Sequence, residues 1–183
     1  MRLSADTQQN CHGVRCKDQR PGHWPDVRRH PGCECGVCGE QEHEHPYATD
    51  GTLVLLVAES TDRFRAIFAF GPVDDVSGYP AEFLPFNASD SKEILVRSPL
   101  AWLHTVKSPT FVLEGGQGNI TSLEAMRQQS KNSQLHFIAV RSTDHFGILA
   151  PTNNLLAQKV IADTGPTCNL NVTQEEVLRL FGG

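Results

Sequence analysis

Residues Gly51–Asp75 read GTLVLLVAESTDRFRAIFAFGPVDD, and this stretch decides the fold class. Its first part, GTLVLLVAES, is mostly apolar and predicts a buried helix. The run FRAIFAF (64–70) is short and apolar and ends at a Gly-Pro pair, which is typical of a buried strand. A helix followed at once by a buried strand indicates an α/β protein with a parallel sheet.

The same alternation continues to the end of the chain. Two more strands are predicted at PTFVLEGG (109–116) and QLHFIAV (134–140), and two more long helices at ITSLEAMRQQSKN (120–132) and TNNLLAQKVIADTG (152–165). A proline-containing excursion covers 77–108, and the loop RSTDHFGILAP covers 141–151. TQEEVLRLF (173–181) is expected to be a short helix, with Thr173 and Glu176 at capping-box spacing. We therefore expect an α/β fold of about three parallel strands with flanking helices.

Upstream of residue 47 the composition changes abruptly. Residues 1–46 hold five of the six cysteines but only five residues among Val, Ile, Leu, Met and Phe. So little apolar surface cannot offset the entropy cost of ordering the segment. We expect residues 1–46 to be disordered and residues 47–183 to form the folded domain.

Charge and hydropathy exclude several kinds of partner. The net charge of -5 offers no basic face to nucleic acid or to an anionic membrane. No apolar run approaches the roughly 18 residues of a membrane span, and the N-terminus lacks the apolar core of a signal peptide. We expect a cytoplasmic protein that binds neither nucleic acid nor membrane, and no motif implies a cofactor.

Four segments, taken in order, resemble one enzyme family. GTLVLLVAES (51–60) resembles the helix after a G-x-S-x-G-G-T nucleophile elbow, and RAIFAFGPVDD (65–75) resembles the sixth strand and its loop. RSPLAWLHTVKSPTFVLEGG (97–116) is similar to the segment that leads into the seventh strand, and STDHFGILAP (142–151) to the loop with the catalytic histidine. Residues from about 47 to 165 thus resemble the C-terminal half of an α/β-hydrolase, closest to the prolyl oligopeptidase and dienelactone hydrolase branch.

The resemblance implies hydrolysis of a small ester or peptide substrate through a serine acyl-enzyme. This chemistry needs a serine, a histidine that takes its proton, a carboxylate that holds the histidine, and backbone N–H groups for the oxyanion. His145 stands at the histidine position. In the register fixed by the Gly-Thr pair at 51–52, Ala48 stands at the serine and Asp50 at the first glycine. Shifting by one residue makes Thr49 the nucleophile but puts a tyrosine where the tight elbow needs a small residue.

The acid position is altered as well. Laying His-Gly-x-x-Asp over EGGQG (114–118) puts Glu114 at the histidine and Gly118 at the aspartate, with Asn119 next to it. An asparagine cannot do the work of a carboxylate. The residues that could substitute for the acid are Glu114, Asp74 and Asp75.

As written, the chain is expected to be a truncated and catalytically inactive serine hydrolase domain. Ala48 has no hydroxyl, and Asp50 would raise the energy of a developing oxyanion. Asp144 is adjacent to His145, so its side chain diverges from the imidazole and is expected to cap the turn. Ala48→Ser alone should therefore not restore hydrolysis.

A function of another class is also open for this chain. Cys33, Cys35 and Cys38, with His43 or His45, give a Cys3His set for zinc, in a small zinc-binding or interaction module that uses the hydrolase layers as a scaffold. The C-x-C-x-x-C spacing lacks the paired C-x-x-C of zinc ribbons. An altered reading frame or a misassigned start, joined to a truncated gene, explains the same change of composition.

The incomplete fold predicts one further property. In a complete α/β-hydrolase, the strand corresponding to FRAIFAF (64–70) pairs with the strand before the nucleophile. Without that neighbour the strand keeps an unpaired apolar edge, so we expect self-association.

Overall fold

The computed structural model describes residues 49–183. Several expectations concern other residues: the disorder of 1–46, the domain boundary at residue 46, Ala48 at the nucleophile position, and the zinc set of Cys33, Cys35 and Cys38 with His43 or His45. These predictions lie outside the described residues.

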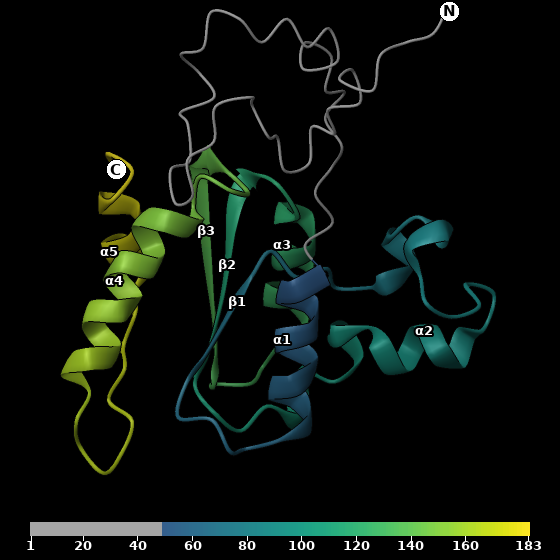
Figure 1. Cartoon of the computed structure of the whole chain (residues 1–183), viewed down its shortest axis with the longest axis horizontal. Coiled ribbons are helices and arrows are strands. Elements are labelled where there is room, and N and C mark those ends of the chain that lie inside the picture. The colour runs from purple at the N-terminus through teal and green to yellow at the C-terminus, as the bar shows by residue number, and fades with distance from the viewer. Residues whose placement is uncertain (1–48) are drawn as a thin grey trace, which may run out of the picture. The chain divides into compact units, whose positions relative to one another are not determined.

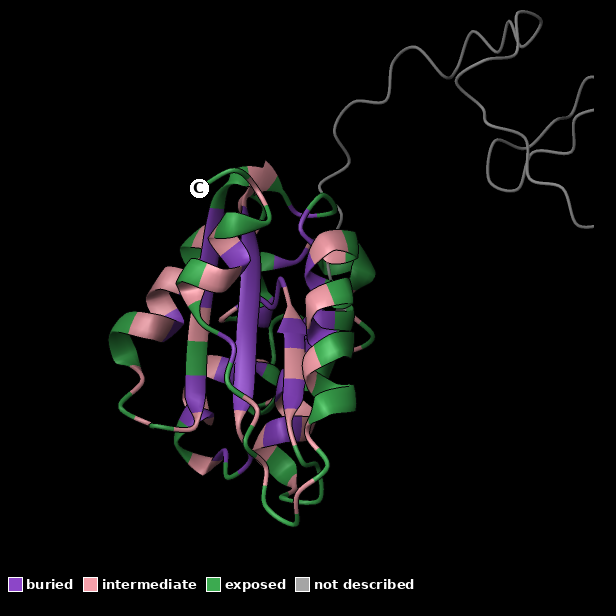
Figure 2. Ribbon diagram, turned by 90° about the vertical axis from the view of Figure 1, so that its left-hand side faces the viewer, coloured by how far each residue is buried: buried purple, intermediate pink, exposed green. Residues whose placement is uncertain are grey.

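Residues 49–183 contain one parallel sheet of three strands in the order β1-β2-β3. β1 spans Ile67–Phe70, β2 spans Thr110–Gln117 and β3 spans Leu135–Asp144. β2 lies in the middle and is buried along its first six residues, as the purple central strand in Figure 2 shows. The expected partial α/β fold with about three parallel strands is confirmed.

Helices cover both faces of this sheet and give the domain three layers. α1 (Thr49–Ser60) and α3 (Ile120–Gln129) lie on one face, and α4 (Leu149–Ala162) and α5 (Gln174–Arg179) lie on the other (Figure 1). The excursion between β1 and β2 forms α2 (Ser91–Arg97) and 3-10 turns at Val76–Gly78, Ala81–Phe83, Pro99–Ala101 and Leu103–Thr105. The expected capping box of α5 is present. No helix in 49–183 has the length and apolar character to cross a membrane.

Two apolar clusters join the layers. The cluster between the sheet and the helices α1 and α3 includes Leu55, Ala69, Val112, Leu123 and Met126. The cluster between the sheet and the helices α4 and α5 includes Phe111, Leu113, Ile138, Leu156 and Val177. Each large apolar side chain removed from water contributes roughly 1.5–3 kcal/mol. The two clusters therefore hold the helices in place on both sides of the strands.

The amino end of α1 lies against the carboxyl end of β1. A Cβ atom on Gly51 would lie 1.9 Å from the carbonyl oxygen of Phe70 and 3.1 Å from the nitrogen of Pro72, so this approach requires glycine. The Thr52 hydroxyl accepts a hydrogen bond from the Val73 amide at 3.0 Å. These contacts fix the first turn of α1 beside the loop that follows β1.

β3 is longer than the sequence predicts. The apolar run indicates an end at Val140, whereas the strand continues to Asp144. The register with β2 shifts between Gly115 and Gln117, and Gln117 pairs with Asp144. A bulge of this kind adds residues to one strand while pairing continues beyond it. The loop expected from residue 141 is therefore shorter, and His145 directly follows the last strand residue.

Candidate functional site

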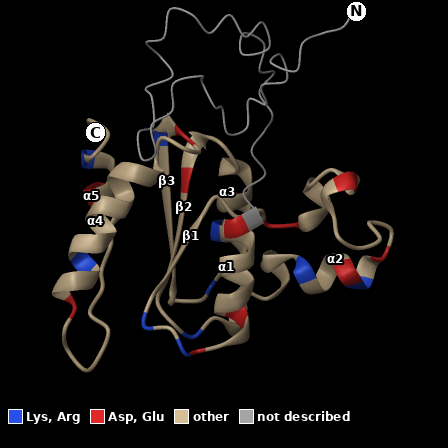
Figure 3. Ribbon diagram, viewed as in Figure 1, with Lys and Arg blue, Asp and Glu red and all other residues tan. Residues whose placement is uncertain are grey.

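Glu114 and His145 come from neighbouring strands. Glu114 lies within β2 and is the only charged residue of that strand, seen as the red segment of β2 in Figure 3. His145 directly follows β3, which pairs with β2. The carboxyl ends of parallel strands meet at one edge of a sheet, which is where α/β proteins place their binding and catalytic groups. The fold therefore brings both residues to the edge at which a site is expected.

The two side chains form a buried carboxylate–imidazole pair. His145 Nδ1 lies 3.1 Å from both carboxylate oxygens of Glu114. Glu114 is 1% exposed and His145 is 7% exposed. The carboxylate also accepts the amide N–H groups of Gly115 at 2.6 Å and Asn119 at 2.9 Å. Three hydrogen-bond donors therefore hold one carboxylate in a place that is nearly closed to solvent.

This contact governs the protonation of His145. The hydrogen bond to Glu114 raises the pKa of His145 above its ordinary value of 6.5, while burial lowers it and the charges of Glu114 and Asp144 raise it further. A carboxylate only accepts hydrogen bonds, so Nδ1 carries a proton and the neutral ring keeps its lone pair on Nε2. A histidine held in this tautomer can take a proton from a neighbouring hydroxyl or water.

Gly118 makes room for the Glu114 carboxylate. A Cβ atom on residue 118 would lie 2.7 Å from Glu114 Oε1 and 3.0 Å from Glu114 Oε2. The carboxylate of Glu114 thus occupies the space in which any side chain at position 118 would begin. The absence of a side chain at Gly118 is therefore what lets the Glu114 carboxylate lie here.

The loop after β1 closes over the pair through Gly71 and Asn119. Gly71 has φ +61°, and a Cβ atom there would lie 2.1 Å from Cε1 of His145. The side-chain amide of Asn119 donates to the carbonyl of Gly71 at 2.7 Å. The role of Gly71 could not be predicted from the family resemblance. The Gly-Pro pair after the apolar run could have indicated it, because such a pair marks a sharp turn of the backbone.

The two aspartates after β1 have other partners. Asp74 accepts a hydrogen bond from the Ser122 hydroxyl at 2.7 Å. Burial acts to raise the pKa of Asp75, but hydrogen bonds from Ser77 and Ser98 outweigh it and hold that pKa below its ordinary value. No hydrogen bond or ion pair within residues 49–183 joins either aspartate to His145. Of the three substitute acids, the structure brings Glu114 to the histidine.

Asp144 and Phe146 flank the imidazole. Asp144 Oδ1 accepts the amides of Phe146 at 3.0 Å and Gly147 at 2.5 Å, which confirms the expected turn cap. The Phe146 ring meets the His145 ring edge-on, with centroids 5.1 Å apart. Because the Phe146 side chain is largely exposed, the open side of the histidine carries an apolar aromatic surface.

The amino end of α1 reaches the same edge of the sheet. Gly51 packs on Phe70 and Pro72, and Gly71 between them packs on His145. Asp50 is exposed in the first turn of α1. Among the side chains described, those of residues 50–183, no serine, threonine or cysteine forms a hydrogen bond to His145. The same residues hold no group of three or more metal-ligating side chains that could bind an ion.

Comparison with known proteins gives one distant likeness. No protein-family profile matches the chain, and no curated protein does. A solved structure described as "Crystal Structure of the 2,6-dihydroxy-pseudo-oxynicotine Hydrolase" superposes with a TM-score of 0.48 at 14% sequence identity. The match covers 66% of this chain and 40% of that chain. The α/β fold itself is given by the three parallel strands and their flanking helices.

Proposed function

We propose that the described residues are the distal half of an α/β-hydrolase domain of the prolyl oligopeptidase and dienelactone hydrolase branch. The lineage hydrolyses small ester or peptide substrates through a serine acyl-enzyme. In this chain the histidine base and its carboxylate are assembled, whereas the nucleophile is missing, so the domain is catalytically inactive as written. The observation that carries the proposal is the buried contact between Glu114 and His145 Nδ1 at 3.1 Å.

The chemistry of this pair matches two of the three members of a catalytic triad. In a triad, the carboxylate holds the histidine in the tautomer that leaves Nε2 free to accept the serine proton. Glu114 is placed to do this for His145, and the amides of Gly115 and Asn119 fix the carboxylate in turn. A buried carboxylate costs several kcal/mol unless it is paired and hydrogen-bonded. An arrangement that keeps such a charge beside a histidine at the carboxyl edge of the sheet favours a catalytic origin.

The proposed absence of activity follows from the residue types at positions 48 and 50. In the family register, Ala48 offers no hydroxyl to His145. Asp50 replaces a glycine near the place where the oxyanion develops. A unit charge about 5 Å from an oxyanion raises its energy by about 3 kcal/mol at an effective dielectric constant of about 20. Adding a hydroxyl at position 48 alone would therefore leave the transition state poorly stabilised.

The test uses the full chain and three variants: Ala48→Ser, His145→Ala, and the double variant. Turnover of p-nitrophenyl acetate and labelling by a fluorophosphonate probe would be measured, with an active serine hydrolase as positive control. We expect no His145-dependent turnover and no labelling in any of the four proteins. Labelling of Ala48→Ser that disappears in the double variant would show a complete active site, and the inactive half-domain would be the wrong interpretation.

A further inference from the structure

A hollow of about 570 Å³ lies at the opposite end of the sheet from His145. Its lining comes from the 3-10 turns before β2 and from the turn before β3, so it lies at the amino ends of these two strands. No residue of the Glu114–His145 pair lines it. Sites for small organic molecules typically measure about 300–1,000 Å³, so the hollow has a suitable size.

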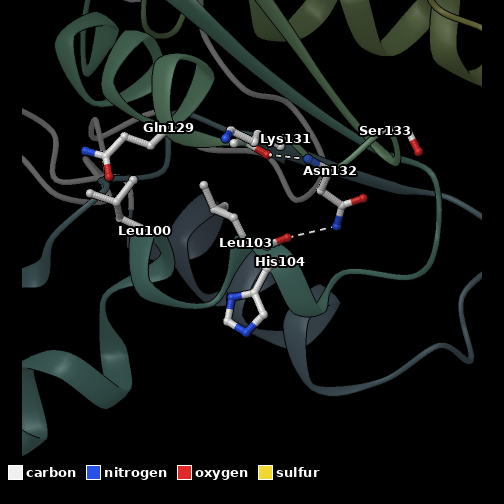
Figure 4. Close-up of a pocket in the computed structure, with 8 residues that line it drawn as sticks. Leu100, Leu103, His104, Gln129, Lys131, Asn132 and Ser133 are labelled. Atoms are coloured by element: carbon white, nitrogen blue, oxygen red, sulfur yellow. Dashed lines mark hydrogen bonds between the residues drawn. The ribbon is translucent and has the colours of Figure 1, made fainter.

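Asn132 ties the two walls of the hollow together (Figure 4). Its side-chain amide donates to the carbonyls of Leu103 at 2.9 Å and Val106 at 2.8 Å on the opposite wall. Its side-chain oxygen accepts the amide of Gln134 at 3.0 Å, and its own amide donates to Ser130 Oγ at 3.2 Å. The hollow is therefore formed by fixed backbone segments rather than by loose side chains.

Four polar side chains around the hollow have no hydrogen-bonding partner among the described residues. Figure 4 shows Gln129, Lys131 and Ser133 on one side and His104 on the other, and all four line the hollow. Within residues 49–183, none of these four side chains makes a hydrogen bond or an ion pair. Gln129 and Ser133 are neutral, Lys131 is a cation, and the lining contains no aspartate or glutamate. The local potential therefore favours an anion.

Lys131 has an alternative role that the contacts argue against. A cation near a helix C-terminus stabilises the helix, and Lys131 lies just beyond the end of α3. The last turn of this helix is closed without Lys131, because the Ser130 amide donates to the Met126 carbonyl at 2.9 Å. Arg127 provides a basic residue in the last turn. Lys131 is thus not needed to finish α3 and remains available to the hollow.

The apolar part of the lining defines the rest of the ligand. Leu103 is buried at 4% exposure and Leu100 is half-buried, and both face the hollow. The His104 ring stacks on Trp102 with centroids 6.4 Å apart, which holds the imidazole at the edge of the hollow. We propose that this hollow binds a small organic carboxylate with an apolar body. Lys131 and His104 contact the carboxylate, and Leu100 and Leu103 contact the body.

Trp102 provides a direct readout of binding. The chain has two tryptophans, so Trp24→Phe leaves Trp102 as the only indole. Benzoate would be titrated into this protein while Trp102 fluorescence is followed, with benzyl alcohol and benzylammonium as uncharged and cationic probes of similar size. We expect a saturable change with benzoate alone. Lys131→Gln should weaken benzoate binding by about fivefold, the upper range for one exposed charge contact.

Lys107→Gln is the matched control, because Lys107 is also exposed but does not line the hollow. It should leave benzoate binding unchanged. Amide chemical-shift mapping should place the bound benzoate at residues 100–104 and 129–133. The proposal is overturned if benzoate gives no saturable change, if benzyl alcohol binds equally well, if both lysine variants weaken binding alike, or if the shifts map elsewhere.

Discussion

Replacing Glu114 with alanine should destabilise the domain by at least about 3 kcal/mol. The carboxylate accepts from the Gly115 amide, the Asn119 amide and His145 Nδ1, at 2.6, 2.9 and 3.1 Å. A buried donor left without an acceptor costs about 1–3 kcal/mol, and Glu114→Ala creates three such donors. Small domains have a total stability of about 5–15 kcal/mol, so a large share would be lost.

Urea unfolding followed by circular dichroism measures this loss. Glu124→Ala is the control, since Glu124 pairs with Arg127 at 3.3 Å and Arg141 at 3.0 Å near the surface. Such exposed pairs contribute less than about 1 kcal/mol. If Glu114→Ala does not fold, the loss of stability is measured in Glu114→Gln, because the amide oxygen of glutamine can still accept from some of the three donors. A loss below 1 kcal/mol in both Glu114 variants, with an unchanged urea slope, would refute the buried acceptor network.

The loss should also depend on pH. The pKa of His145 is raised in the folded state, so the stabilisation it contributes is complete below the ordinary value of 6.5 and disappears as pH rises through the folded pKa. Without its carboxylate, the buried imidazole resists protonation instead. The cost of Glu114→Ala should therefore be larger at pH 6 than at pH 8, and an equal cost at both would contradict the pairing.

Three further predictions follow from burial and from the sheet edge. Gly51→Ala should lower the free energy of unfolding in urea by more than about 2 kcal/mol, since its Cβ would lie 1.9 Å from the Phe70 oxygen. Gly78→Ala is the control and should cost little, because nothing lies within 4 Å of a Cβ there. Burial raises the pKa of Glu59 to about 8 from 4.5, so stability should fall as pH rises across this range. Glu59→Met should remove that dependence and raise the stability at pH 7, as urea unfolding at several pH values would show. β1 has no second strand neighbour among residues 49–183, so sedimentation should show self-association at micromolar concentration, and a monodisperse monomer would contradict it.

The layered fold could be predicted because the local sequence pattern identifies each helix and strand. Apolar runs marked all three strands, two of them ending at Gly or Pro, and the structure confirms the three strands in these segments. The bounds were less accurate where pairing or caps decide them. α4 begins at Leu149 rather than Thr152, because Pro151 is tolerated in the first turn of a helix, where its missing N–H has no partner to lose.

The candidate site could be predicted only in part, because its geometry depends on contacts through space. His145 follows a strand and precedes a helix, which is a sequence pattern. The acid that contacts His145 could not be predicted in this way, since the family pattern places an aspartate at position 118. The Glu114 carboxylate lies beside His145 because Gly118 has no side chain in the space that it occupies. Neither residue alone reveals this contact, and the sequence left Asp74 and Asp75 open as substitute acids beside Glu114.

Titration of the His145 imidazole by carbon-edited NMR, in the wild type and in Glu114→Gln, tests whether Glu114 acts as the acid of this site. A His145→Asn spectrum identifies the resonance. We expect the pKa of His145 to lie above 6.5 in the wild type and to fall below its ordinary value in Glu114→Gln, because burial then acts without the charge of the carboxylate. His136, whose pKa is lowered by burial alone, should titrate identically in both proteins. An unchanged pKa of His145 in Glu114→Gln would show that the carboxylate does not hold the base.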